Sequence, residues 1–440
     1  MEYLSLLGIF AAVAVFCLMS MKRYPIYIAS SAATLVIAIF SAMHPYTTIT
    51  GPFMTNMSGF INKYFILFLV SALFGKMMDV TGCTRIIALG LAKLVRLSKQ
   101  SSIQKLLATL SITFFYFAMI YVGITAYVIA FTVVYISRDL FQELDMPMWF
   151  FPYGPAGGIQ PAYVLAGSLG TTNVIACQGF EVPLTAGWVL SIICTVVYFA
   201  VLAVVILFDI KKVEKSAEGF MPSGGPLLEA SATMQGPMAD DKLPNLVNAV
   251  ICFSTPIIAI LGFKQSPVYA LLIAIVVCLI FNFKRLPSVR GAVSDGFGTA
   301  IFPVINVACV NGFSGTLQIS AGFAVVSTLL QVLPGVLPAM VLMTGLTVVV
   351  GTSSGFLSAF IDLFREWMLP LGISAGICAR LITIAGFPCM MPHNAGLVNA
   401  LTLTRIDFRK GCWIYLKGNI IPGTITMAVA IILMFAGVFQ

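Results

Sequence analysis

Hydrophobic residues occur along this chain in long uninterrupted runs, and short polar stretches separate them. In the first half the runs cover 3–20, 25–43, 60–80 and 186–210. A helix needs roughly 20 apolar residues to cross the hydrocarbon core of a bilayer. At this spacing the 440 residues would hold about ten spans. The pattern therefore predicts an all-α polytopic membrane protein.

Positive charges between the runs predict the direction of each span. Lys22 and Arg23 follow the first run, a basic stretch from Arg85 to Lys105 follows the third, and Lys211 and Lys212 follow 186–210. Because basic loops face the cytoplasm, the first span is expected to run inward from a periplasmic N-terminus. No basic segment precedes it, so we expect a retained helix and not a cleaved signal.

One long polar stretch divides the chain nearly in half. We predict a first transmembrane repeat at 1–210, a cytoplasmic linker at 211–245, and a second transmembrane repeat at 246–440. Each span of the second half runs opposite to its counterpart, and the C-terminus is expected to be periplasmic. This is the arrangement of an inverted-topology repeat. The second-half spans are predicted at 246–263, 268–283, 296–318 and 412–436, with an external loop at 319–336.

Local sequence matches support the repeat. Gly75 and Gly82 have the same separation as Gly315 and Gly322, and the sequence Val-Gly-Ile-Thr-Ala at 122–126 resembles Val-Gly-Thr-Ser-Ser at 350–354. Small residues are common in membrane helices, so each match alone is weak. The same order in both halves favours an internal repeat.

Small and polar residues interrupt four of the apolar stretches near their centres. We predict re-entrant hairpins at 107–142 and 337–368, and broken spans at 148–180 and 370–404. Each unpaired backbone group in hydrocarbon costs on the order of several kcal/mol, so such breaks occur only where they line a cavity. Helix N-termini at a break favour anions, and free carbonyls coordinate cations. The four breaks therefore predict a binding site near the middle of the membrane.

The residue types at the breaks define the candidate site. Arg380 has three interpretations: it neutralises a substrate carboxylate, it binds a carbonyl or an acid, or it reaches the membrane interface. His393 is either a structural residue or a group that binds substrate or a proton. The hairpin-tip oxygens also offer ligands for Na⁺. Apart from Arg380, the predicted substrate- or ion-binding residues are Gly123, Thr125, Thr171, Thr172, Asn173, Gly351, Thr352, Ser353, Ser354, His393 and Asn394.

Composition narrows the functional class. Hydrophobic residues make up 60% of the chain and charged residues 9%, against about 25% charged in ordinary soluble domains. Lipid is therefore the expected solvent, nucleic-acid binding is excluded, and the net charge of +8 is assigned to cytoplasmic loops. The 10 cysteines include no C-x-x-C pair and are interpreted as small buried hydrophobic residues.

Three segments resemble the gluconate permease (GntP) family. The stretch from Gly75 to Gly82 is similar to the family's G-K-L-L-E-D-S-G signature, Gly351–Ser354 resembles its G-S-A-T hairpin, and Pro392–Asn394 resembles its P-H-V-N-D-S-G segment. The resemblance implies the ion transporter superfamily fold, a homodimer, the bacterial inner membrane, and proton-coupled uptake of gluconate or related hydroxy acids. Where the family has an acid after the Asn, this chain has Ala395. Sodium coupling through hydroxyl, amide and carbonyl oxygens is the alternative.

The predicted function is secondary-active, cation-coupled import of small organic anions, without catalysis and without a cofactor besides the coupling ion. Two other classes compete with it. An anion channel would place one pore among like subunits, whereas this chain encloses its own pseudo-twofold site. An intramembrane hydrolase would use the G-x-S-x-G match at 351–355, but that motif needs a strand–turn–helix elbow.

Overall fold

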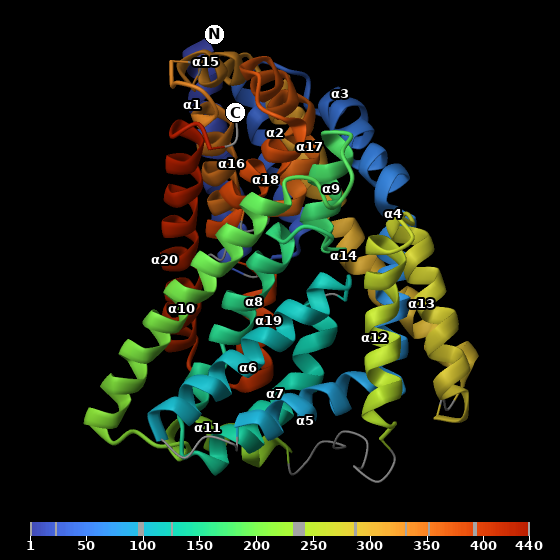
Figure 1. Cartoon of the computed structure of the whole chain (residues 1–440). Helices are drawn as coiled ribbons and strands as arrows, with labels where there is room; N and C mark the ends of the chain where they lie inside the picture. Colours follow the sequence, from blue (N-terminus) through green and yellow to red (C-terminus); the bar gives the residue numbers. More distant parts are fainter. Residues whose placement is uncertain are drawn as a thin grey trace.

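The structure, a computed structural model, describes residues 2–22, 24–95, 101–124, 126–231, 243–285, 288–330, 332–350, 353–389 and 394–438. Within these ranges every regular element is a helix. The chain forms an elongated bundle with N- and C-termini at the same end (Figure 1). The predicted all-α polytopic fold class is confirmed.

The first half contains two apolar helices, a long helix, a short connecting helix, a hairpin, a broken helix and a final long helix. A short α3 (Pro45–Thr48) and a π-helical turn (Ile49–Phe53) lead into the long helix, and a 3₁₀ turn (Met148–Phe150) precedes the broken helix. The other elements are α1 (Glu2–Met21), α2 (Ile26–Phe40), α4 (Met54–Val80), α5 (Cys83–Val95), the hairpin of α6 (Ser101–Tyr121) and α7 (Ala126–Glu143), the broken pair α8 (Tyr153–Val164) and α9 (Thr171–Gly179), and α10 (Trp188–Ser216).

The second half repeats this order. Its elements are α12 (Leu246–Leu261), α13 (Pro267–Asn282), α14 (Val289–Gln318), α15 (Ala321–Leu330), the hairpin of α16 (Leu337–Val350) and α17 (Ser353–Met368), the broken pair α18 (Ala375–Ala385) and α19 (Ala395–Thr404), and α20 (Phe408–Phe435). Short 3₁₀ turns follow α13, α17 and α18, at Phe283–Arg285, Leu369–Leu371 and Phe387–Cys389. In Figure 1 the α6–α7 hairpin lies at the lower end and the α16–α17 hairpin at the upper end.

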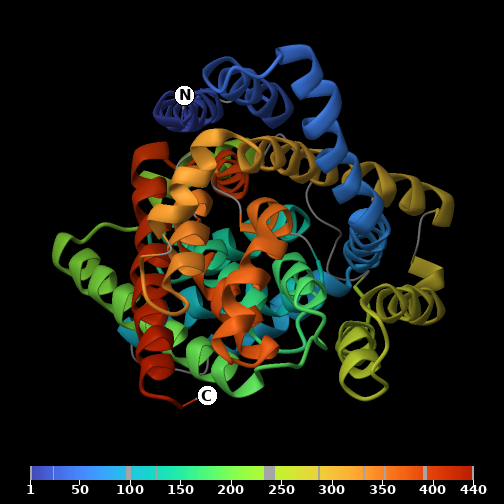
Figure 2. The same ribbon diagram turned by 90° about the horizontal axis from the view of Figure 1, so that it is seen from above.

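The packing between the halves is reciprocal. Helix α4 lies along α14, α2 contacts α14 as α13 contacts α4, and α9 contacts α17 as α19 contacts α7. Helices α10 and α20 pack against each other. Viewed from above, α1, α2, α4 and α12–α14 lie around one side of the hairpins and broken helices (Figure 2). This reciprocity is what an internal pseudo-twofold relation would produce, while the boundaries of the two repeats remain a prediction.

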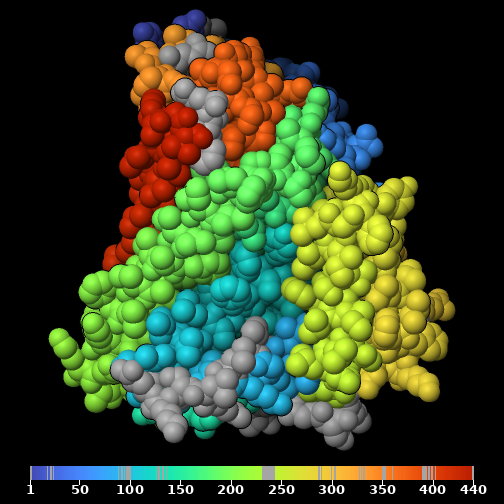
Figure 3. All heavy atoms as spheres, viewed as in Figure 1, coloured from blue at the N-terminus to red at the C-terminus, as the bar shows by residue number. Residues whose placement is uncertain are grey.

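Large hydrophobic side chains cover the outside of the bundle. Trp188, Val196 and Phe208 are exposed along α10, which crosses one face of the molecule obliquely (Figure 3). A surface of this kind is stable in lipid and not in water. In the described part of the chain, five helical stretches are long and apolar enough to cross a membrane: Pro45–Val80, Ser101–Tyr121, Trp188–Ser216, Pro267–Arg285 and Phe408–Phe435.

Two segments expected to be irregular contain helices. The predicted external loop at 319–336 includes α15, and the predicted linker at 211–245 includes the end of α10 and α11 (Met221–Ser231). Gly and Pro in 221–231 suggested a loop, but Pro226 occurs within helix α11. Tertiary contacts outweigh the weak local propensity, since α11 packs against α7 and the turn at 148–150.

A polar network holds this linker segment against the bundle. Trp149 donates a hydrogen bond of 2.8 Å to Glu218, and Lys410 contacts the same carboxylate at 2.6 Å. Partial burial opposes ionisation of Glu218, but these partners hold its pKa below the usual value. Nearby, Asp209 of α10 accepts a hydrogen bond from Tyr153 and pairs with Lys417 of α20. The network therefore joins the two halves at the lower end.

Candidate functional site

Helices α9 and α17 lie side by side and parallel, with their N-terminal ends together. At these ends the hydroxyl oxygens of Thr172 and Ser353 are 3.3 Å apart. At the other end Arg365 donates to the Gly179 carbonyl at 3.3 Å and pairs with Glu181 at 2.6 Å. The hydrogen bond from Arg365 lowers the pKa of the exposed Glu181 carboxyl. The guanidinium also complements the negative C-terminal ends of the two helices.

The meeting of these two helix N-termini favours negative charge at this point. The first turn of an α-helix leaves N–H groups without intrahelical acceptors, and the N-cap Gly170 has no side chain to accept from them. Each N-terminus also has a partial positive charge of roughly half an elementary unit. Two parallel helices that begin at one point add these charges, and the Thr172 and Ser353 hydroxyls supply further donors.

The first hairpin tip contacts the first break directly. Tyr121 donates its hydroxyl to the Ala166 carbonyl at 2.8 Å, and its own carbonyl accepts from the Leu169 N–H at 2.8 Å. Gly123 follows with φ of +93°, a conformation that costs a side-chain-bearing residue about 1–2 kcal/mol. A Cβ there would also lie 3.2 Å from the Leu169 side chain. Gly123 therefore shapes the tip and holds it against the break.

The second hairpin contacts the second break in an equivalent way. Thr344 of α16 donates to the Ala385 carbonyl at 2.8 Å, as Tyr121 does to Ala166 in the first half. A Cβ added to Gly386 would lie 3.0 Å from the Cβ of Ser353. Ser353 therefore contacts both the start of α9 and the second break, so parts of both halves converge on this serine.

Two candidate amides have structural partners. The Asn394 side chain accepts from the Leu397 N–H at 3.0 Å and caps α19. The Asn173 amide donates to the Ser168 carbonyl at 2.7 Å, and its oxygen accepts from Arg380. Both residues lie at the breaks, and these hydrogen bonds orient the adjoining helix ends.

Arg380 is fully buried in α18 and binds protein acceptors with all five of its N–H groups. They go to the carbonyls of Val164, Leu184 and Ala186, at 3.0, 2.6 and 2.8 Å, to the Asn173 oxygen, and to the Cys177 sulfur at 3.5 Å. Of its three interpretations, carbonyl binding is the one the structure supports. These bonds hold the first break together, and a charge contact between Arg380 and a substrate carboxylate stays a prediction.

The structure places some predicted residues and leaves others outside its described ranges. Thr171 and Ser354 are half-buried in the first turns of α9 and α17. Thr125, Gly351, Thr352 and His393 lie outside the described residues. That the placed residues bind substrate remains a prediction.

Tyr121 and Thr344 were missed by the sequence analysis. Both lie inside apolar runs with no charged neighbour to mark them. Their only signal is a hydroxyl in the first arm of each predicted hairpin, and it becomes informative only once the break carbonyls are placed.

The close contact of α9 and α17 gives a testable expectation at Gly179. A Cβ there would lie 1.9 Å from Ile361, so Gly179→Val should separate the helices. Overpacking of this kind costs about 1–3 kcal/mol, and we expect a lower thermal unfolding temperature in detergent together with weaker uptake. Gly225→Val is the matched control, because open space surrounds Gly225. Wild-type stability of Gly179→Val would contradict the packing.

Comparison with known proteins agrees with a transporter fold. No protein-family model matches the chain. It is 24% identical over 401 residues to the uncharacterized transporter YxjC of Bacillus subtilis, covering 81% of this chain and 83% of that protein. The crystal structure of the YdaH transporter of Alcanivorax borkumensis superposes with a TM-score of 0.53 at 14% identity, over 87% of this chain and 88% of that one. These similarities and the apolar helices support a multi-pass membrane transporter.

Proposed function

We propose that this protein is a secondary-active symporter that imports small organic acid anions together with a cation. The contact of Thr172 with Ser353 is the observation that supports the proposal most directly. It joins the N-terminal ends of two parallel helices, one from each half, and the backbone that precedes α9 is unwound. Such a place suits a carboxylate, since N–H and hydroxyl donors surround it.

The substrate class follows from the donor types around Thr172 and Ser353. Hydroxyls and backbone N–H groups bind a carboxylate and hydroxyl groups, and Arg380 is already occupied. A small monoanion such as gluconate or a short hydroxycarboxylate fits this chemistry. The resemblance to the gluconate permease family points to the same class.

Coupling to a cation follows from energetics. Moving one negative charge inward against 100 mV costs about 2.3 kcal/mol. One cotransported cation makes the uptake of a monoanion electroneutral, and two make it electrogenic and accumulative. We favour protons, with Na⁺ bound by hydroxyl and carbonyl oxygens as the alternative.

The distribution of charge favours a cytoplasmic location for the lower end of Figure 1. The basic ends of α10, with Lys211, Lys212 and Lys215, and the start of α20, with Arg409 and Lys410, lie there. The positive-inside rule then puts both termini in the periplasm of a bacterial inner membrane. A homodimer is proposed from the family resemblance.

Transport fits the Ser353 environment better than hydrolysis does. Ser353 is the first residue of α17, and helix α16 precedes the hairpin tip. The nucleophile elbow of G-x-S-x-G hydrolases instead exposes its serine between a strand and a helix. Ser353→Ala also separates these functions, since a hydrolase would lose its activity completely.

Uptake by proteoliposomes tests the proposal. Labelled gluconate and 3-hydroxybutyrate are offered under an imposed inward proton gradient or an inward sodium gradient, with protein-free vesicles as the control. We expect saturable, proton-dependent accumulation of at least one acid. Sodium-dependent accumulation would identify Na⁺ as the coupling ion in place of the proton, and the protein would still be a carrier. Flux that does not saturate and never exceeds equilibrium would indicate a channel and contradict the proposal.

A further inference from the structure

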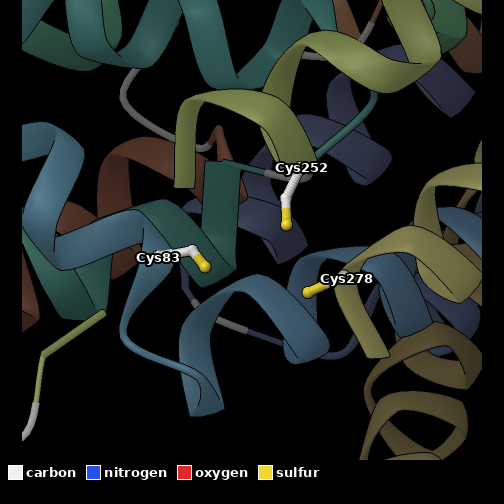
Figure 4. A group of neighbouring side chains, drawn as sticks. All are labelled: Cys83, Cys252 and Cys278. Carbon is white, nitrogen blue, oxygen red and sulfur yellow. The ribbon is translucent and has the colours of Figure 1, made fainter. Parts of the chain in front are cut away.

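Three cysteines that are far apart in the sequence meet at one point in the fold. Cys83 begins α5, Cys252 lies in α12 and Cys278 in α13. Their sulfur atoms all lie within 4.8 Å of one another, and Figure 4 shows the three sulfurs pointing toward a common space. All three side chains are fully buried. Their sequence separation gave no hint of this cluster.

We propose that Cys83, Cys252 and Cys278 form a three-thiolate site for a soft d¹⁰ metal ion, the class that includes Zn²⁺, Cd²⁺ and Cu⁺. Soft thiolate ligands select such ions over Na⁺ or Mg²⁺. Metal–sulfur bonds of about 2.3 Å would bring the sulfurs to roughly 4 Å from one another. The cluster therefore needs to contract by less than about 1 Å to bind an ion.

The surroundings of the sulfurs suit thiolates. The Asn282 amide donates to Cys252 at 3.5 Å and to the Cys278 carbonyl at 3.2 Å. Hydrogen bonds of this kind to ligating sulfurs orient and stabilise metal sites. The amide oxygen of Asn282 is buried and has no hydrogen-bond partner among the described residues, so it can accept one further hydrogen bond.

A metal ion explains the third sulfur better than a disulfide does. A disulfide would use two cysteines and leave one, and it needs an oxidant that this buried location does not provide. Thiols at the cytoplasmic end, where charge places α5, stay reduced. Binding instead releases thiol protons as the sulfurs coordinate the ion.

The position of the site gives it a structural consequence. Gly82, with φ of +78°, turns the chain from α4 into α5, and α5 leads toward the first hairpin. An ion bound by Cys83 and by the α12–α13 pair would fix this corner to the second half. We expect the bound ion to raise the thermal unfolding temperature, and a chelator to reverse the rise.

Metal binding to the reduced full-length protein in detergent tests the inference. We expect one Cd²⁺ per chain with an ultraviolet thiolate charge-transfer band, or one Cu⁺ per chain in competition with a chelator. X-ray absorption of the wild type loaded with Zn²⁺ should show three sulfur ligands at about 2.3 Å. Each of Cys83→Ser, Cys252→Ser and Cys278→Ser should lose the binding, and Cys194→Ser, a buried cysteine of α10, should retain it.

Several results would overturn the site. They are the failure of both Cd²⁺ and Cu⁺ to bind, binding that persists in the triple serine variant, and a disulfide between two of the cysteines in freshly purified protein. X-ray absorption of the wild-type protein tests the three-sulfur site even if a serine variant fails to fold. None of these readouts depends on transport, so failure here leaves the proposed carrier function untouched.

Discussion

Replacing Arg380 with Met is expected to prevent the protein from reaching a stable fold, and not merely to weaken transport. The change removes the donor from the Val164 and Ala186 carbonyls and from the Asn173 oxygen, while the Leu184 carbonyl keeps its hydrogen bond from the Gly167 N–H. Each unsatisfied buried group costs about 1–3 kcal/mol. The sum approaches the whole stability of many proteins, about 5–15 kcal/mol, although Met also removes the cost of burying a charge.

Size-exclusion chromatography and thermal unfolding of the detergent-solubilised variant measure this effect. Arg380→Lys should fail as well, because an ammonium keeps the buried charge but has three donors in place of five. Arg365→Met is the control, since its partner Glu181 is exposed and exposed pairs contribute at most about 1 kcal/mol. A monodisperse Arg380→Met protein with the wild-type unfolding temperature and no uptake would restore the substrate-binding interpretation.

The fold was predictable because lipid imposes a strong pattern on the sequence. Apolar runs and basic loops gave the order of spans, hairpins and breaks that the described helices follow. The helix α15 in the loop 319–336 was missed because a short apolar helix with no charge looks like a connection when length and charge are the only signals. Helix α11 was missed because its Pro and Gly residues are loop signals in isolation.

The candidate site was predictable only at the level of segments. Broken backbone marked where Thr172, Ser353 and Asn394 lie, since polar residues at membrane depth are costly and therefore informative. Partner assignment was not predictable. Arg380 and Asn173 satisfy each other and the carbonyls of the first break, and no sequence pattern distinguishes a clamp of this kind from a substrate ligand. The same limit hid the meeting of Cys83 with Cys252 and Cys278.

Removing the hydroxyl of Thr172 or Ser353 is expected to reduce kcat/KM for uptake by about tenfold or more. Hydrogen bonds to a charged ligand contribute about 1.5–3 kcal/mol, and 1.4 kcal/mol corresponds to tenfold. Thr172→Val keeps the side-chain shape and Ser353→Ala removes one atom, so both proteins should fold. Because the two oxygens are 3.3 Å apart, the double variant should deviate from the product of the single effects.

Matched controls separate substrate binding from packing. Thr34→Val in α2 and Ser137→Ala in α7 remove buried hydroxyls that donate to carbonyls of their own helices, and both should transport normally. A substrate that binds the folded wild type raises its unfolding temperature, and this rise should shrink in Thr172→Val and Ser353→Ala while the substrate-free temperature stays constant. Unchanged uptake and an unchanged ligand-induced rise in both variants would show that the anion binds elsewhere, whereas a lower substrate-free temperature would assign the two hydroxyls to the packing of α9 on α17.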